Sequence, residues 1–167
     1  MISKSAVHAV NALAALAKLP PGAYLGTAEL AEHIDAPRNY LGKLLKTLAT
    51  HGLLDSQKGK GGGFRLARPP DAVSLFDVME PIEHVSRWDG CFLGQSRCSA
   101  DAPCAMHSRW RDVRDTYLQF LRQTTLADVA SHDAGNPLRI QHPDQEAQGG
   151  RAANQCELPR QGRGATS

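Results

Sequence analysis

The feature that most restricts the fold is a glycine-rich segment between two short apolar stretches. Four of the six residues from Lys58 to Gly63 are glycine. Glycine adopts the positive φ angles that tight hairpin turns need, and it weakens a helix interior. We therefore predict a β-hairpin over residues 53–67, closed by Pro69 and Pro70, with a tip thin enough to approach a groove closely.

Three helical segments precede this hairpin. Ser3 is predicted to cap the first helix, which ends at Pro20 and Pro21. A short helix is predicted over residues 27–34, and a third helix begins at Pro37 and ends at Gly52. Two short helices joined by a tight turn form a helix-turn-helix, and a hairpin directly after it is a wing.

Two further helices are predicted after the wing, and Thr125 and Asp128 predict a short final helix to about Ala130. Ser74 and Asp77 resemble a capping box, which predicts a helix to about Glu80 that is ended by Pro81. A later seam, spaced alternately four and three residues apart, predicts a long coiled-coil-like helix. The seam consists of Met106, Trp110, Val113, Tyr117, Phe120 and Thr124. We favour a dimer interface for it over packing within one chain, because it holds three of the nine aromatic residues.

The segment from residue 37 to residue 68 is strongly basic. It holds seven Lys and Arg and one Asp, a local balance of +6 in a chain of net charge +2. A basic helix-turn-helix is typical of binding to double-stranded DNA, and a solvated charged face is the alternative. We expect the first turn of the third helix to face base edges, and other side chains to contact phosphates. The base-facing candidates are Arg38, Asn39 and Tyr40, with a core position as the alternative for Tyr40; the phosphate candidates are Lys43, Lys46, Lys58, Lys60 and Arg65.

Three of the four cysteines lie in a seventeen-residue stretch that ends at His107. Cys91, Cys98 and Cys104 are separated by six and then five residues. Thiolates and an imidazole suit a soft transition metal or an iron–sulfur cluster. Structural zinc sites usually contain closely spaced cysteine pairs, so the wider spacing favours a cluster, although spacing alone leaves zinc open. His107 is the candidate fourth ligand, with a plain helix-start position as its alternative role.

Other features narrow the class of protein. No apolar run reaches the roughly 20 residues that span a membrane, and the N-terminus lacks a signal-peptide pattern, so we expect a cytoplasmic protein. Clustered cysteines in a reducing compartment favour metal binding or redox sensing. We see no nucleophile–base constellation and no phosphate-loop motif, so we do not expect an enzyme. Cys156 is expected to be a free thiol without an assigned function.

These motifs together resemble the IscR/NsrR family of iron–sulfur transcriptional regulators. The resemblance covers about residues 1–131, through the glycine-rich wing before Phe64, the cysteines with His107, and residues 110–113. It implies a winged-helix homodimer joined by the long helix. It also implies a cluster bound by the three cysteines and one weaker ligand.

The identity of the weaker ligand distinguishes two branches of that family. In the IscR-like branch a histidine three residues after the last cysteine completes a [2Fe–2S] cluster, and His107 matches it. In nitric-oxide-sensing relatives an acidic residue near the partner's N-terminus completes a [4Fe–4S] cluster. This chain has no acidic residue before Glu29, which favours [2Fe–2S], with [4Fe–4S] as the alternative and His8 as a substitute ligand. The first cysteine spacing is one residue longer than in the closest IscR-like pattern.

The predicted fold class is mainly α: a winged helix-turn-helix with a small β-hairpin wing and a long C-terminal dimerisation helix. Its divisions are a DNA-binding domain (1–81), a cluster-binding loop (82–104), the dimerisation helix with a short final helix (105–131) and a disordered tail (132–167). The resulting hypothesis is a transcriptional repressor or activator whose operator affinity depends on a cluster that responds to iron–sulfur status, iron, redox stress or nitric oxide. The alternatives are a small iron–sulfur electron-transfer protein and a regulator with a purely structural zinc.

Overall fold

The computed structural model of the protein describes residues 2–94, 101 and 103–132 of the 167-residue chain. Cys98, Cys156 and the predicted disordered tail beyond residue 132 lie outside the described residues. The helices are α1 (Lys4–Ala17), α2 (Thr27–His33), α3 (Arg38–Thr50), α4 (Leu75–Glu83), α5 (His107–Gln123) and α6 (Leu126–His132), with 3-10 turns η1 (Pro70–Ala72) and η2 (Val85–Asp89). The strands β1 (Leu54–Gln57) and β2 (Gly63–Leu66) form an antiparallel hairpin in which Leu54 pairs with Leu66.

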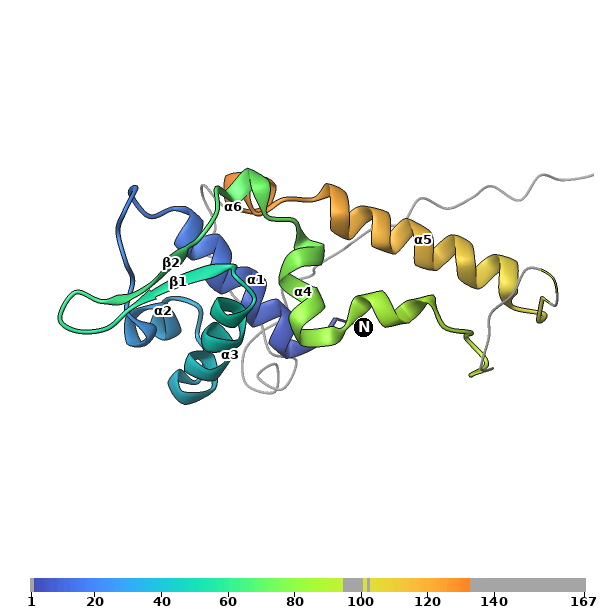
Figure 1. Cartoon of the computed structure of the whole chain (residues 1–167), viewed down its shortest axis with the longest axis horizontal. Coiled ribbons are helices and arrows are strands. Elements are labelled where there is room, and N and C mark those ends of the chain that lie inside the picture. Colours follow the sequence, from blue (N-terminus) through green and yellow to red (C-terminus); the bar gives the residue numbers. More distant parts are fainter. Residues whose placement is uncertain (1, 95–100, 102, 133–167) are drawn as a thin grey trace, which may run out of the picture.

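The predicted winged helix-turn-helix is confirmed. Helices α1 to α3 pack around the hairpin at one end of the molecule, and α5 extends away from them beside α4 (Figure 1). The Ser3 hydroxyl caps α1 by accepting a hydrogen bond from the Ala6 amide at 3.1 Å. The leucines of α3 face a core shared with α1, α2 and the hairpin, so its polar face is left outside. Within the described residues, no helix is long and apolar enough to cross a membrane.

Helix α4 connects this core to α5. Leu75 and Met79 of α4 form a second buried cluster with Leu118 and Leu121 of α5, and Ala6 of α1 joins it. The predicted seam of α5 omits Leu118 and Leu121, which pack in this cluster, and it includes Tyr117, which is partly buried against the same cluster. Helix α5 therefore has one buried face and one exposed apolar face.

The predicted end of α4 is wrong. The sequence places it at about Glu80, before Pro81, but the helix continues through Pro81 to Glu83. Proline has a helical φ angle and loses one backbone hydrogen bond, so one further turn is tolerated when packing supports it. Ile82 packs against the first core, and the His84 amide donates to the Glu80 carbonyl at 3.0 Å. The segment that leads to Cys91 begins after this extra turn, with η2.

The glycines of the wing have two different structural roles. Gly59 and Gly61 have φ angles of +102° and +78°, as the turn requires. Gly63 instead lies against the chain that precedes α2, where a Cβ atom would stand 2.1 Å from the Leu25 carbonyl oxygen. That close approach permits two backbone hydrogen bonds between Leu25 and Phe64, of 3.0 and 2.9 Å. The base of the wing is thus joined to the α1–α2 connection.

Candidate functional site

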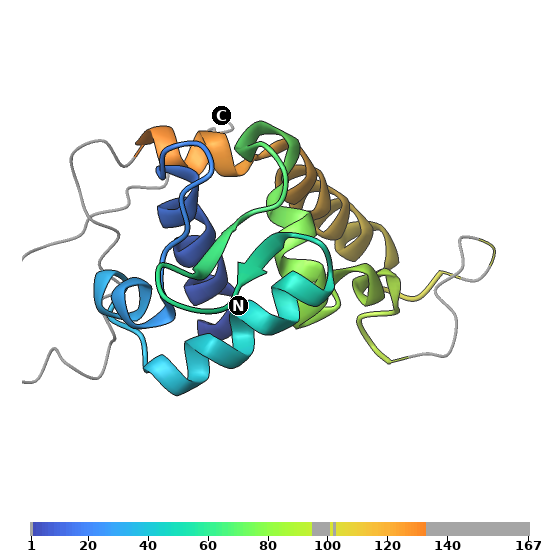
Figure 2. The ribbon, with the colours of Figure 1, turned by 60° about the vertical axis from the view of Figure 1, so that its left-hand side comes forward.

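The predicted DNA-reading residues lie on the outer face of α3. Arg38, Asn39, Lys43 and Lys46 are all exposed, while the leucines of the same helix are buried. Figure 2 shows α3 beside the hairpin, so the helix and the wing lie on the same part of the molecule. A basic surface of this kind is what a partner with a phosphate backbone needs.

Tyr40 is partly exposed and also makes contacts with another helix. It is 37% exposed, yet its hydroxyl donates a hydrogen bond to the Ser5 hydroxyl oxygen at 2.6 Å. Its ring also meets the buried His8 ring edge-on, with centroids 5.8 Å apart. Tyr40 thus attaches the first turn of α3 to the first turns of α1. The sequence contains no local signal for this contact, because the partners lie on different helices.

The wing residues are not equivalent. Lys58 and Lys60 are exposed at the turn, where the sequence placed them. Arg65 lies in β2, and its Nε and Nη2 atoms donate to one Asp55 carboxylate oxygen at 3.1 and 3.0 Å. Its guanidinium also covers the Tyr24 ring, 4.9 Å from the centroid. These contacts fix Arg65 at the base of the wing, and the hairpin register, which pairs Asp55 with Arg65, is the signal that could have revealed them.

Two of the predicted metal ligands meet at the start of α5. Cys91 follows η2 and Cys104 precedes α5, and their Sγ atoms are 3.9 Å apart. Both side chains are half-buried, and neither is in a disulfide. His107 is the first residue of α5, and its amide donates to the Cys104 carbonyl at 3.0 Å. The structure thus brings Cys91 and Cys104 together and places His107 within one turn of Cys104, whereas Cys98 lies outside the described residues.

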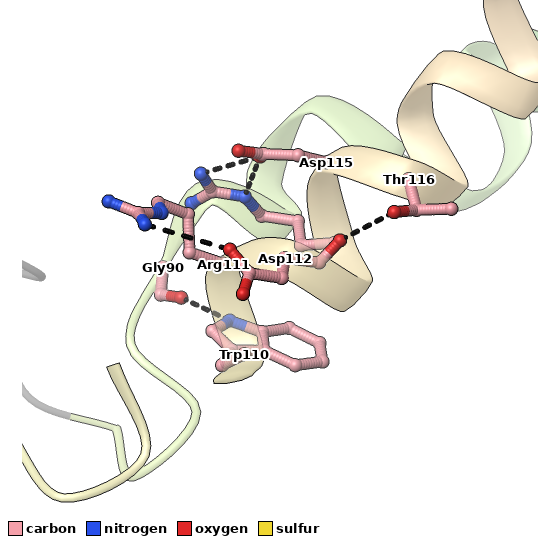
Figure 3. A network of polar contacts seen from close by, with 7 residues as sticks. Gly90, Trp110, Arg111, Asp112, Asp115 and Thr116 are labelled. Carbon is pink, nitrogen blue, oxygen red and sulfur yellow. Dashed lines mark hydrogen bonds and ion pairs between the residues drawn. The ribbon is translucent and has the colours of Figure 1, made fainter. Parts of the chain in front are cut away.

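Trp110, which the sequence places in the apolar seam, holds the segment before Cys91 in place. The Trp110 indole nitrogen donates to the Gly90 carbonyl oxygen at 3.0 Å, as Figure 3 shows. The Trp110 ring also contacts the Phe92 ring, with centroids 5.3 Å apart. Residues on both sides of Cys91 are therefore attached to the first turns of α5. The indole N–H, which needs a partner when it is partly buried, was the available signal.

The residues that lead to Cys91 are also attached to α4. The Glu80 carboxylate accepts hydrogen bonds from the Ser86 amide at 2.8 Å and the Ser86 hydroxyl at 2.6 Å. Burial opposes ionisation of this carboxyl group, but the hydrogen bonds from Ser86 and the charges of His84 and Arg87 together lower the pKa of Glu80. Three residues further along α4, Glu83 accepts from the Ser3 amide at 2.6 Å. The last turn of α4 therefore contacts both the approach to Cys91 and the start of α1.

The cysteine pair meets a simple geometric requirement for sharing a metal ion. Two thiolates bound tetrahedrally to one ion, with bonds of about 2.3 Å, stand roughly 3.8 Å apart. The Cys91–Cys104 separation of 3.9 Å matches this value without a change of backbone. Across the described ranges, no three His, Cys, Asp or Glu side chains lie close enough to form a metal-binding group.

A winged helix with a basic outer face, joined through α4 to a cysteine segment at the start of a long helix, defines a DNA-binding regulatory protein. The family model described as Rrf2, an iron-dependent transcriptional regulator, matches residues 2–132, and the chain belongs to this family. It is a family of transcriptional regulators rather than enzymes, which confirms the predictions of a regulator and of a non-enzyme.

Individual relatives agree with this placement. The chain is 32% identical over 131 residues to a protein of Aquifex aeolicus classed as an HTH-type transcriptional regulator, which covers 77% of this chain and 90% of that one. It is 26% identical over 125 residues to the HTH-type transcriptional regulator IscR of Escherichia coli, covering 75% of this chain and 76% of that one. The solved structure of CymR, the global cysteine regulator of B. subtilis, has a TM-score of 0.66 at 26% identity, covering 79% of this chain and 97% of that chain.

Proposed function

We propose that the protein is a homodimeric transcriptional regulator whose operator affinity is controlled by an iron–sulfur cluster bound through Cys91, Cys98, Cys104 and His107. The observation that carries the proposal is the 3.9 Å separation of the Cys91 and Cys104 sulfurs at the start of α5. The iron-dependent description of the family supports iron over other metals. A cluster at this position would supply a group that reacts with oxidants and nitric oxide, and [2Fe–2S] suits a ligand set of three thiolates and one imidazole.

The contacts around the cysteine segment support a physical route to the DNA-binding helix. Trp110 holds Gly90, next to Cys91, against α5. Glu83, at the end of α4, accepts from Ser3, and two residues later Ser5 accepts from Tyr40 on α3. Ser86, just before the cysteine segment, is joined to Glu80 of α4 by hydrogen bonds, and together these contacts support a path through α4 and α1 to the first turn of α3. We propose that ligand loss shifts the population between two positions of that turn, one competent for operator binding.

The exposed apolar face of α5 supports a homodimer. Met106, Val113 and Phe120 recur at intervals of seven residues and are 36%, 63% and 50% exposed. Such a spacing places side chains on one stripe of a helix, as in a coiled-coil seam. We propose that the same stripe of a second copy covers it, since a two-fold dimer pairs a surface with itself. The two recognition helices are then held at a set separation, which selects the spacing of the half-sites in the operator.

The experiment that tests the proposal is anaerobic purification of the full chain with measurement of iron, acid-labile sulfide, visible absorption and operator binding. We expect iron and sulfide in equal amounts, a visible absorption band, and operator affinity that changes after exposure to nitric oxide or oxygen. Cys98→Ala should abolish the absorption, whereas Cys156→Ala, outside the ligand set, should retain it. Colourless protein without sulfide, which binds its operator equally with and without iron, would contradict the proposal.

A structural zinc site is the competing assignment, because a single tetrahedral ion also fits the cysteine pair. Metal analysis of the same sample separates the two. Zinc in place of iron, with no sulfide and with operator binding lost only when the protein unfolds, would establish the zinc site. The electron-transfer alternative is set aside by the membership of the Rrf2 family.

A further inference from the structure

The sulfurs of Cys91 and Cys104 are close enough to react with one another. Their separation is 3.9 Å, and a disulfide requires a bond of about 2.05 Å, so the sulfurs must approach by roughly 2 Å. Rotation about the Cα–Cβ bonds moves a cysteine sulfur over distances of this size. Both side chains are half-buried and therefore partly open to solvent, which gives a small oxidant access to them.

The backbone around each cysteine is held so that the pair stays together. The His107 amide donates to the Cys104 carbonyl at 3.0 Å. The Trp110 indole donates to the Gly90 carbonyl at 3.0 Å, directly before Cys91. Both anchors lie in the first turn of α5, so the two sulfurs are positioned by one rigid element. A preorganised pair reacts faster with itself than with a thiol on another molecule.

We propose that Cys91 and Cys104 form an intramolecular disulfide when the metal-free protein meets hydrogen peroxide. One thiolate attacks a peroxide oxygen, the O–O bond breaks, and the sulfur becomes a sulfenic acid while the departing hydroxide takes up a proton to give water. The second sulfur then attacks the sulfenic sulfur. The S–S bond forms, the S–O bond breaks, and the released hydroxide combines with the proton of the second thiol. The two sulfurs lose two electrons in total, and the peroxide gains them.

The modification excludes metal binding at the same residues. A disulfide removes both thiolates from the ligand set, so the oxidised protein takes up no iron until a dithiol reductant restores them. Disulfides in a reducing compartment are transient and regulatory, which fits a reversible bond of this kind. The effect on iron uptake rests on the proposed function, whereas the disulfide itself does not.

The test uses the full chain, freed of metal with a chelator under anaerobic conditions and treated with hydrogen peroxide. Free thiols are then alkylated, and the protein is digested with trypsin without reduction and analysed by mass spectrometry. Trypsin cuts after Arg97, which separates the Cys91 peptide (88–97) from the peptide that holds Cys98 and Cys104 (98–109). The expected result is a cross-link between these two peptides that disappears after reduction, in a protein that remains monomeric by mass in denaturant.

Matched variants identify the partner of Cys91. A Cys98→Ser, Cys156→Ser double variant keeps only the proposed pair and should form the cross-link as completely as the wild type. Cys104→Ser should lose it and leave Cys91 alkylated. Recovery of Cys91 as an alkylated peptide from the double variant would overturn the inference, and so would a wild-type cross-link to Cys98, to Cys156 or between chains. Iron and sulfide analysis of untreated protein tests the proposed function separately, so that either idea can fail while the other stands.

Discussion

Replacement of Gly63 by alanine tests the structural reason for the glycine-rich wing. The added Cβ atom would stand 2.1 Å from the Leu25 carbonyl oxygen and 2.4 Å from its carbon, distances that real Cβ atoms do not show. Both close atoms belong to the backbone, so no side-chain rotation relieves the overlap. The strand must move away from the α1–α2 connection, and both hydrogen bonds between Leu25 and Phe64 are then lost or weakened.

The size of the effect follows from these two hydrogen bonds. A backbone hydrogen bond contributes about 0.5–1.5 kcal/mol net, so Gly63→Ala should lower the free energy of unfolding by about 1–3 kcal/mol. At about 4 °C for each kcal/mol, the melting temperature should fall by roughly 4–12 °C. Operator affinity should fall as well, because the wing loses its attachment beside α2. Urea unfolding followed by circular dichroism measures the first quantity, and fluorescence anisotropy with operator DNA measures the second.

Gly90→Ala is the matched control, because it makes the same chemical change where the structure has room. The nearest atom to its added Cβ is the Arg87 carbonyl oxygen, at an ordinary contact distance of 3.7 Å. The φ angle of Gly90 is −66°, which alanine adopts readily. Stability should change by less than about 0.5 kcal/mol. If Gly63→Ala were as stable as this control, the steric account of the wing would be refuted.

Three further outcomes follow from the surfaces of α3 and α5. Lys43→Ala should weaken binding to all DNA sequences and reduce the slope of binding against salt concentration by about one phosphate contact. Arg65→Ala should leave that slope unchanged, because Arg65 binds Asp55. Titration of DNA binding against salt measures both slopes, and equal slopes would contradict the assignment. Phe120→Glu should convert the dimer to monomers in analytical ultracentrifugation. Gln119→Glu changes an exposed neighbour on α5 and should leave the dimer intact. A Phe120→Glu protein that stays dimeric would place the interface elsewhere. Gly42→Ala should raise the free energy of unfolding by about 0.5–1 kcal/mol, because alanine favours a helix over glycine. The added Cβ would meet only the Thr27 methyl group, at 3.6 Å. A loss of stability in urea unfolding would show that helix packing requires the glycine.

The helix-turn-helix and the wing were predictable because their signals are local. Ser3 caps α1 through an amide three residues away, and the capping box of Ser74 and Asp77 forms as expected. The helical period of leucines on α3 separates its buried and exposed faces without reference to the rest of the chain. The end of α4 was not predictable, since the turn beyond Pro81 depends on packing of Ile82 against residues of other helices.

The candidate site was predictable in composition but not in arrangement. Soft ligands clustered in a short stretch indicate a metal site whatever the fold. Which of them meet depends on how α4 and α5 pack, and the buried contacts of Leu118 and Leu121 that govern this packing lie outside the predicted seam. The anchoring roles of Trp110 and Glu83 depend in the same way on partners that are distant in sequence.

By itself, the order of residues determined the elements: caps, helical periods and glycine turns act over a few positions, and the donor atoms of the cysteine segment are set by residue type. Tertiary structure decided which of these elements touch. It placed the sulfurs of Cys91 and Cys104 3.9 Å apart, attached Tyr40 to the start of α1, and left one stripe of α5 uncovered. These contacts arise from the burial of apolar faces that lie far apart in the chain, and such burial is a property of the whole packed molecule rather than of any local pattern.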